Sequence, residues 1–467
     1  MIICLSNYII LNCLFMEFKS VNPNSGEIIA TYHEHTENEI KSILHDAGRA
    51  FEIWREVSIH ERSFLMKKAA AVLLENIDSY SRTITIEMGK PIIESKAEIK
   101  KCAWVCNYYA QNAEDFLANE IIETDAQESF ISYEPIGCVL AVMPWNFPFW
   151  QVFRFAVPAL MAGNVGLLKH ASSVPGCAIK IQELFEKAGF PKGVLQTLFI
   201  NHDKVKEVIE SDVVRAVALT GSDKAGASVA SIAGKSIKKS VMELGGSNAF
   251  IVWNDADLDK TVETALTARL QNTGQSCIAA KRFIILENVY EGFLSKFTEG
   301  MKAFKAGDPL DENTRIGPLS REDLAVKLQE QVQKSVEQGA KVILGGKRKG
   351  AFFEPTIMVN VKPGMPVFDE ETFGPVAAII KAKNEDEAFE LANKSPYGLG
   401  ISLFTRNVEK AKKCIRKISD GSFFINELVK SDPRLPFGGT KQSGYGRELS
   451  KAGILEFVNI KTVYIKY

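Results

Sequence analysis

The chain has no excess of charge of either sign. Its 56 lysines and arginines are balanced by 57 aspartates and glutamates, which leaves a net charge of −1. No basic stripe or basic patch interleaved with aromatic residues occurs, so we expect no nucleic-acid partner. Internal repeats and low-complexity stretches are also missing, and 46% of the residues are hydrophobic. This composition is typical of a globular protein with more than one domain.

Cysteine is sparse and scattered along the 467 residues. The eight cysteines are Cys4, Cys13, Cys102, Cys106, Cys138, Cys177, Cys277 and Cys414. Cys102 and Cys106 lie four positions apart, but no histidine or second cysteine pair follows at zinc-binding spacing. We therefore read them as residues on a helix face and predict no metal site. Dispersed thiols fit a reducing compartment, which predicts a cytoplasmic protein.

No segment is long and apolar enough to span a membrane, and we expect no membrane partner. Residues 1–16 are uncharged and mostly apolar. They lack the basic region and the small-residue cleavage site of a signal peptide. We interpret residues 1–16 as an extension from an upstream start, with Met16 as the functional start.

Apolar runs alternate with helical periods, which predicts parallel sheets covered by helices. Apolar residues that recur every three to four positions predict helices over about 37–54, 60–86, 92–117, 149–162, 174–188 and 223–234. Short apolar runs at 139–143, 165–169 and 214–219 predict the strands of one doubly wound sheet, and runs at 248–252, 282–286, 376–380 and 422–425 predict a second. Ligands bind such sheets at the carboxyl ends of the strands.

Two further segments, 129–134 and 461–467, alternate between polar and apolar residues like exposed strands. Exposed strands invite pairing with another chain.

Cys277 is the candidate nucleophile, because it lies in a turn rich in glycine and polar residues, Gly274-Gln275-Ser276-Cys277. The plainer interpretation is a buried apolar side chain. Glu243 stands before the paired glycines 245 and 246 and is the candidate general base. Its plainer interpretation is a surface carboxylate at a strand end, but the apolar residues before it indicate partial burial, which would raise its pKa.

Three further motifs occur in a fixed order with these two. They are Pro-Trp-Asn-Phe-Pro at 144–148, Glu-Glu-Thr-Phe-Gly-Pro at 370–375 and Pro-Phe-Gly-Gly at 436–439. With them the chain, from about Asn22 to Tyr467, resembles the NAD(P)-dependent aldehyde dehydrogenase superfamily. Its succinate-semialdehyde dehydrogenase branch looks closest.

The resemblance implies an α/β fold with two doubly wound domains and a β-strand oligomerisation arm. Residues 17–118 and 139–243 would form the NAD(P)-binding domain and residues 244–435 the catalytic domain. Residues 119–138 and 454–467 would form the oligomerisation strands of a homodimer or homotetramer.

The resemblance also implies a mechanism. Cys277 would add to the aldehyde to give a thiohemiacetal, hydride would pass to NAD or NADP, and Glu243 would activate water to hydrolyse the thioester. The side-chain amide of Asn146 and the backbone N–H of Cys277 would stabilise the negative oxygen.

The glycine pattern of a common dinucleotide site, Gly-x-Gly-x-x-Gly, is absent. In its place a strand leads through Gly221 and Ser222 into a helix, where N–H groups can hold a pyrophosphate. The resemblance assigns the cofactor to Trp145, Lys169, Ser172, Gly221, Ser222, Gly226, Leu244, Glu371 and Phe373. Glu371 would contact the nicotinamide ribose, and Phe373 would pack nearby.

One departure concerns the choice of cofactor. The family often has Lys-Pro-Ser/Ala-Glu where this chain has Lys169-His170-Ala171-Ser172. A carboxylate at position 172 would repel a 2′-phosphate, whereas the serine hydroxyl can donate to it, so NADP should be tolerated. We interpret His170 as a structural variant of the proline.

The substrate residues implied by the resemblance are Arg154 and Ser431, which would bind the distal carboxylate of succinate semialdehyde. Gln271 stands where many of these enzymes have a second arginine. A different small aldehyde, such as glutarate semialdehyde or a neutral aliphatic aldehyde, remains an alternative. Arg154 opposes a cationic, betaine-type substrate. A non-enzymatic protein on this fold would be marked by loss of Cys277 or Glu243, and both are present.

Overall fold

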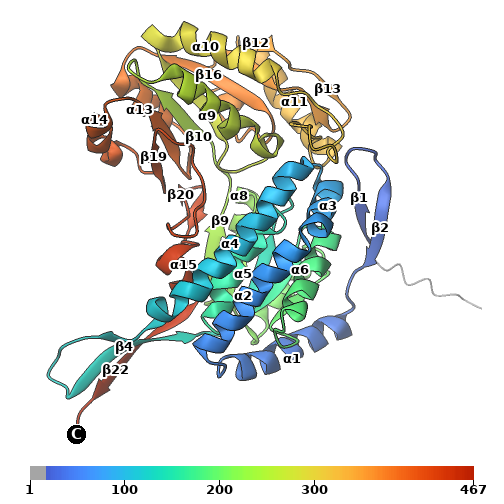
Figure 1. Ribbon diagram of the computed structural model, residues 1–467, viewed down its shortest axis with the longest axis vertical. Coiled ribbons are helices and arrows are strands. Elements are labelled where there is room, and N and C mark those ends of the chain that lie inside the picture. Colours follow the sequence, from blue (N-terminus) through green and yellow to red (C-terminus); the bar gives the residue numbers. More distant parts are fainter. Residues whose placement is uncertain (1–16) are drawn as a thin grey trace, which may run out of the picture.

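The computed structural model describes residues 17–467, so the predicted extension at residues 1–16, Met16 included, lies outside the described residues. Two α/β units lie one above the other, and a narrow arm projects from the lower one (Figure 1). The helices are α1 (Glu37–Trp54), α2 (Ile59–Glu75), α3 (Ile77–Met88), α4 (Ile92–Leu117), α5 (Trp150–Met161), α6 (Pro175–Lys187), α7 (Val205–Glu210), α8 (Asp223–Lys235), α9 (Leu258–Leu270), α10 (Glu287–Lys302), α11 (Glu322–Glu337), α12 (Pro366–Asp369), α13 (Glu385–Asn393), α14 (Val408–Lys413) and α15 (Ser450–Leu455).

The lower unit is built on a six-stranded sheet with the strand order β21-β9-β8-β5-β6-β7. Its strands are β5 (Cys138–Met143), β6 (Val165–His170), β7 (Leu195–Thr197), β8 (Val214–Thr220), β9 (Lys239–Glu243) and β21 (Gly444–Tyr445). All neighbours run parallel except β21, which is antiparallel to β9. Strands β6 and β7 lie on one side of β5, and β8, β9 and β21 lie on the other. The chain therefore changes sides at β5. A crevice therefore opens at the carboxyl ends of β5 and β8.

The upper unit is built on a seven-stranded sheet with the strand order β12-β15-β16-β11-β10-β18-β19. Its strands are β10 (Asn248–Val252), β11 (Ala280–Leu286), β12 (Lys341–Leu344), β15 (Thr356–Val359), β16 (Val376–Ala382), β18 (Ile401–Phe404) and β19 (Phe423–Ile425). Alternate residues of the central strands enter separate apolar cores, with Ile251 and Ile284 on one face and Phe250 and Phe283 on the other. Both faces are buried, which explains why these strands are continuous apolar runs in the sequence.

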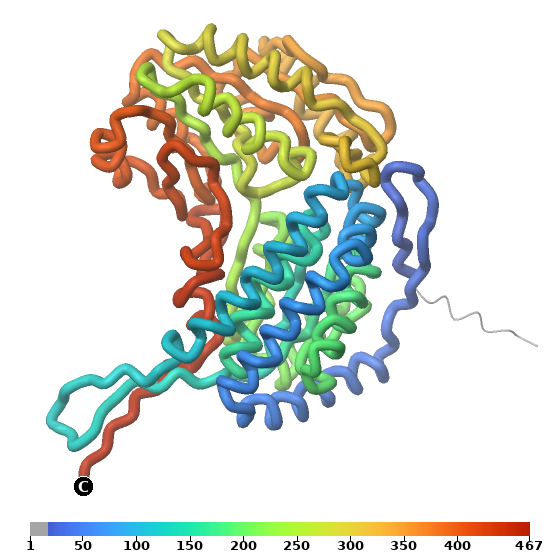
Figure 2. Tube along the Cα trace, viewed as in Figure 1, coloured from blue at the N-terminus to red at the C-terminus, as the bar shows by residue number. Residues whose placement is uncertain are grey.

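The arm is a three-stranded antiparallel sheet of β3 (Glu120–Ile121), β4 (Glu128–Pro135) and β22 (Val458–Ile465). Segments far apart in the sequence meet there, as Figure 2 shows where the strand before the C-terminus runs beside the 118–135 hairpin. Short two-stranded sheets complete the fold, namely β1 (Glu17–Val21) with β2 (Ile28–His33), β13 (Arg348–Lys349) with β14 (Phe352–Phe353), and β17 (Tyr397–Gly398) with β20 (Thr440–Lys441).

The sequence predicted one helix over 60–86, and this was wrong. The structure has two helices there, α2 and α3, which meet at Asn76. The Asn76 side chain donates to the Val72 carbonyl at 2.9 Å and closes α2, while its backbone turns at φ −108° and ψ 20°. An asparagine whose side chain replaces a helical hydrogen bond ends a helix without glycine or proline.

Cys102 and Cys106 lie buried on α4, as predicted. Within residues 17–467, no group of three or more His, Cys, Asp or Glu residues is arranged to hold a metal ion. Over the same residues, every helix is too short or too polar to cross a membrane.

The start of α5 is held by a buried carboxylate from α4. Glu98 Oε1 accepts the backbone N–H groups of Phe149 and Trp150 at 2.8 and 2.9 Å. Its other oxygen accepts the ammonium of Lys90 at 2.5 Å, and both side chains are at most 1% exposed. A carboxylate at a helix N-terminus satisfies free N–H groups and interacts favourably with the helix dipole. Glu98 therefore fixes the loop that precedes α5, residues 144–149.

We expect Glu98→Ala to lower the free energy of unfolding by about 3–5 kcal/mol, because Lys90 would stay buried without its counter-ion. Urea unfolding followed by circular dichroism measures the change. Glu56→Ala is the matched control, since Glu56 is 80% exposed and pairs with Arg55 only at the surface, and it should cost less than about 1 kcal/mol. Equal effects of the two substitutions would contradict the role of Glu98.

Candidate active site

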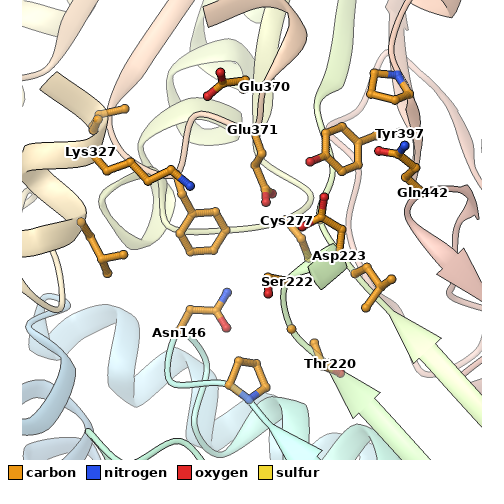
Figure 3. Close-up of a pocket in the computed structure, with 18 of the residues that line it drawn as sticks. Asn146, Thr220, Ser222, Asp223, Cys277, Lys327, Glu370, Glu371, Tyr397 and Gln442 are labelled. Atoms are coloured by element: carbon orange, nitrogen blue, oxygen red, sulfur yellow. The ribbon is translucent and has the colours of Figure 1, made fainter. Parts of the chain in front are cut away.

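The site lies between the two units, where the carboxyl ends of β5 and β8 face the segment before β11. A cavity of about 510 Å³ opens there, and its wall includes the loop after β5, the turn after β8 and Cys277. Figure 3 shows Asn146 and Ser222 on one side of Cys277 and Glu371 on the other, all facing the same space. The cavity is the crevice that the order of the strands predicts.

The segment that carries Cys277 has an unusual backbone. It begins with a short 3₁₀ helix, η1 (Gln271–Gly274), in which Asn272 and Thr273 have φ values of 56° and 54°. This left-handed region is costly for residues other than glycine and persists only where the surroundings impose it. Glu94 Oε2 accepts the Asn272 N–H at 2.7 Å, and Asn272 Nδ2 donates to the Asn146 carbonyl at 2.8 Å. The strained turn is thus tied to α4 and to the loop after β5.

Two buried cations hold the carbonyl groups of the same segment. Lys281 Nζ donates to the carbonyl oxygens of Ser276 and Cys277, both at 2.9 Å. Arg269 donates to the carbonyl oxygens of Gly274 at 2.8 Å and of Ala280 at 2.9 Å. Both cations are fully buried. The position of the sulfur is therefore set by side chains from β11 and α9.

Lys281 also connects the segment to Glu371. The Lys281 ammonium lies 3.2 Å from Glu371 Oε1, which accepts the Gly246 N–H at 3.0 Å. A Cβ on Gly245 would lie 2.7 Å from Glu371 Oε2. Glycine at position 245 therefore lets the carboxylate approach the backbone between β9 and β10.

Cys277 differs from the other described cysteines. Cys102, Cys106, Cys138, Cys177 and Cys414 are buried, whereas Cys277 is partly exposed to the cavity. Burial nevertheless raises the pKa of its thiol to about 11, and Arg154 and Lys281 counter this only in part. The thiol is therefore protonated near neutral pH, and its proton must leave before the sulfur becomes a strong nucleophile.

Asn146 lies next to Cys277 with one amide N–H already engaged. Its Nδ2 donates to the Gln275 carbonyl at 3.1 Å, which leaves one N–H for another acceptor. Its Oδ1 is buried without a hydrogen-bond partner among the described residues. The geometry thus holds a free amide donor beside the sulfur.

Glu243 is the last residue of β9 and is 2% exposed. It is absent from the described residues that line the cavities on either side of Cys277. Burial raises the pKa of its carboxyl group, Arg154 lowers it and Glu448 raises it further. Glu243 also raises the pKa of the Cys277 thiol, so the two groups interact electrostatically. The carboxyl group is therefore buried beside the site and does not line either cavity.

Arg154 lines the second cavity and also interacts electrostatically with Glu243. It is 2% exposed and forms an ion pair with Glu448, which is also buried. Its Nη2 donates to Thr220 Oγ1 at 3.3 Å. The charge of Arg154 is thus already balanced within the protein, which the sequence did not indicate.

Most of the predicted cofactor residues meet in the first cavity. Its lining includes Trp145, Gly221, Ser222, Leu244, Glu371 and Phe373. The rings of Trp145 and Phe373 meet edge to face with centroids 5.7 Å apart. The Ser222 hydroxyl caps α8 by accepting the Ala225 N–H at 3.3 Å. This bond leaves the hydroxyl hydrogen free, and Ser222 and Asp223 at the start of α8 line the cavity.

Three predicted cofactor residues, Lys169, Ser172 and Gly226, are not among the described residues that line this cavity. Ser172 is exposed beyond the end of β6. Gly226 lies inside α8, where a Cβ would come within 2.5 Å of Leu244 Cδ2, so its visible role is to make room for that side chain. The family resemblance alone does not show whether such a residue packs within the protein or contacts the cofactor.

His170 has a structural role in this arrangement. Its Nδ1 accepts the Ala171 N–H at 2.9 Å, so its Nε2 carries the proton and donates to the Pro148 carbonyl at 2.9 Å. Burial lowers the pKa of His170 to about 4, and the ring stays neutral near pH 7. It joins the end of β6 to the loop that contains Asn146.

A second cavity of about 330 Å³ lies on the other side of Cys277. The predicted substrate residues Arg154, Gln271 and Ser431 all line it. So do Lys101 and Trp150, which the sequence analysis missed. The signal that was available is the helical spacing of Glu94, Glu98 and Lys101, which places three ionisable side chains along one face of α4.

A family model, curated relatives and solved structures that are similar to this chain give consistent results. The model of the "Aldehyde dehydrogenase family" matches residues 14–463. A probable succinate-semialdehyde dehydrogenase (NADP+) of Synechocystis sp. is 49% identical, and the match covers 96% of this chain and 100% of that protein. Succinate-semialdehyde dehydrogenase (NADP+) 1 of Mycobacterium tuberculosis is 46% identical over the same shares. A succinic semialdehyde dehydrogenase of Streptococcus pyogenes, solved with NADP+, superposes with a TM-score of 0.94 at 39% identity and covers 96% of this chain and 100% of its own.

We expect Cys277 alkylation to accelerate about tenfold per pH unit between pH 7 and 10, because only the thiolate reacts and the pKa of the thiol is about 11. Iodoacetamide labelling of the cofactor-free protein, read by peptide mass spectrometry, measures the rate at this cysteine alone. A free cysteine peptide, with a pKa of about 8.5, should level off near pH 9.5. A plateau for Cys277 below pH 8 would contradict the raised pKa.

Proposed function

The chain belongs to the aldehyde dehydrogenase family, and we propose that it oxidises succinate semialdehyde to succinate with NADP+ as the hydride acceptor. The observation that carries this proposal is the place of Cys277, which lines both cavities. One cavity presents a helix N-terminus and paired glycines, and the other presents cationic and hydroxyl donors. A sulfur between them can hold an aldehyde carbon next to a nicotinamide ring while the far end of the substrate occupies the second cavity.

The first cavity fits a nicotinamide dinucleotide. The N-terminus of α8, with Gly221 and Ser222, suits a pyrophosphate. A Cβ on Gly246 would lie 2.6 Å from the Cys277 carbonyl oxygen, so the glycine keeps the backbone close to the nucleophile. Glu371 and Phe373 would hold the nicotinamide ribose, and Trp145, Leu244 and Lys169 would support the rest of the cofactor. When bound, the nicotinamide accepts the hydride released from the aldehyde carbon.

The Cys277 thiol gives its proton to a water molecule, and its sulfur adds to the aldehyde carbon. A C–S bond forms, the C=O π bond breaks, and the oxygen becomes negative. The free N–H of Asn146 and the backbone N–H of Cys277 stabilise that oxygen. Loss of hydride leaves a thioester on the sulfur. The four-carbon product stays attached until the C–S bond is hydrolysed.

Glu243 acts as the base for that hydrolysis. Its Oε1 is buried without a hydrogen-bond partner within the described residues, so it is free to accept a proton. Rotation of the buried side chain brings the carboxylate to a water molecule in the cavity. The water attacks the thioester carbonyl, the C–S bond breaks, and the acid leaves with Cys277 restored.

Residues 17–118 and 139–243 form the nucleotide-binding domain in this proposal, and residues 244–435 form the catalytic domain. The arm, from residues 119–138 and 454–467, joins copies of the chain into a homodimer or homotetramer. Ile121, Ile460 and Tyr464 on the arm are 77%, 59% and 49% exposed, which supports an apolar contact there. A cytoplasmic location stays a prediction.

We expect the protein to reduce NADP+ with succinate semialdehyde at a kcat/KM well above that with butanal, a neutral aldehyde of the same chain length. A panel that also includes glutarate semialdehyde and longer aldehydes, followed at 340 nm, tests the substrate. Cys277→Ser should remove the activity with every aldehyde while NADP+ still binds, because a hydroxyl is a far weaker nucleophile. A preference for butanal would replace the proposal with a general aldehyde dehydrogenase.

We expect Ser172→Glu to shift selectivity from NADP+ toward NAD+. A carboxylate facing the 2′-phosphate costs on the order of 1–3 kcal/mol, or about 5- to 150-fold in kcat/KM for NADP+. Ser172→Gln has nearly the same shape without the charge and is the matched control. The ratio of kcat/KM values at low salt measures the shift, and equal ratios for the two variants would show that position 172 does not face the phosphate.

A further inference from the structure

Lys101, Trp150 and Ser431 line the second cavity and are joined there by hydrogen bonds. Lys101 Nζ donates to Ser431 Oγ at 2.8 Å, and Trp150 Nε1 donates to the same oxygen at 3.1 Å. The Lys101 ammonium also lies 4.3 Å from the centre of the Trp150 ring. The Ser431 hydroxyl still has its own hydrogen to donate. The Trp150 N–H is used by Ser431, so two ammonium N–H groups of Lys101 and the Ser431 hydroxyl remain for an anion.

Lys101 carries a charge that the protein does not balance. The carboxylates that act on it, those of Glu98 and Asp432, are bonded to other groups. Glu98 accepts Lys90 and the two N–H groups at the start of α5. Asp432 accepts the Arg434 guanidinium at 2.7 and 2.9 Å. In the described part of the chain, Lys101 therefore has no carboxylate within ion-pair distance.

Burial lowers the pKa of Lys101 to about 8, and the neighbouring Arg154 adds to this effect. The side chain still carries most of its charge at pH 7. A desolvated cation of this kind gains more from an incoming carboxylate than a surface lysine does, because water screens the interaction less.

Arg154 is placed differently. Its guanidinium is already neutralised by Glu448, and that pair lies next to Glu243. Its Nε faces Glu448 and one N–H of Nη2 donates to Thr220, which leaves Nη1 and the second N–H of Nη2 as donors. Arg154 can thus give a substrate a hydrogen bond, but its charge already has a partner, unlike that of Lys101.

We infer that Lys101 and the Ser431 hydroxyl, which Trp150 Nε1 holds in place, bind the distal carboxylate of the substrate, and that Lys101 is the main source of selectivity for an acidic aldehyde. This inference rests on the proposed function. Recognition of the negative charge of the substrate is thus assigned to Lys101 on α4, whereas Arg154 on α5 supplies a hydrogen-bond donor that is already paired with Glu448.

The test compares Lys101→Met, Lys101→Arg and the wild type at pH 7, each with succinate semialdehyde and with butanal. Methionine keeps the length and the apolar stem but removes the charge. We expect Lys101→Met to lower kcat/KM for succinate semialdehyde about 10- to 150-fold, mostly through KM, and to leave butanal within about twofold. Lys101→Arg should recover part of the loss. Succinate should inhibit butanal oxidation by the wild type and much less by Lys101→Met.

Lys100→Met is the matched control, because Lys100 is the exposed neighbour on the same helix. It should change neither substrate. Unaltered butanal oxidation shows that Lys101→Met is folded. If Lys101→Met keeps the wild-type preference for succinate semialdehyde, the inference is overturned while the proposed function stands. If the wild type itself shows no preference over butanal, the proposed function fails and the inference fails with it.

Discussion

The buried ammonium of Lys281 is the interaction on which the arrangement of the site depends. It holds two carbonyl oxygens of the Cys277 segment and lies against Glu371, which in turn holds the backbone between β9 and β10. One cation thus joins the nucleophile, the residue proposed for the nicotinamide ribose and the link between the two units. Because Lys281 is fully buried, loss of any one of these partners leaves its charge unsatisfied, and the segment has little freedom to take another shape.

Some buried charges in the protein have a partner and others do not, and the proposed function depends on this difference. Glu98 with Lys90 and Arg154 with Glu448 are ion pairs that hold the start of α5 and its second turn. Lys101 has no such partner among the described residues. Ion pairs keep groups in place, whereas an unpaired charge in a cavity favours a ligand of opposite charge. The same helix, α4, therefore contributes both a structural carboxylate and a candidate recognition site three residues later.

The sequence predicted the strands well, because buried parallel strands are continuous apolar runs, so 139–143 and 248–252 were recognisable. The sequence also singled out Cys277 by its residue type and its turn, and the structure places this cysteine in the wall of both cavities. Its role as the nucleophile stays a prediction. The break at Asn76 was missed because it depends on one side chain bonding to a carbonyl rather than on glycine or proline. The partners of Lys101 and Arg154 could not be predicted from the sequence, because the identity of a counter-ion depends on which distant segments meet in the fold. Glu448, for example, reaches Arg154 only because β21 adds to the edge of β9.

The pairing of β21 with β9 has a consequence for biosynthesis. The strand β21, the carboxylate of Glu448 and the arm strand β22 all come from the last part of the polypeptide. Until the ribosome has released them, the first sheet lacks its edge, Arg154 lacks its counter-ion and β4 lacks its partner. A nascent chain that already contains Cys277 therefore does not yet hold a finished reactive centre.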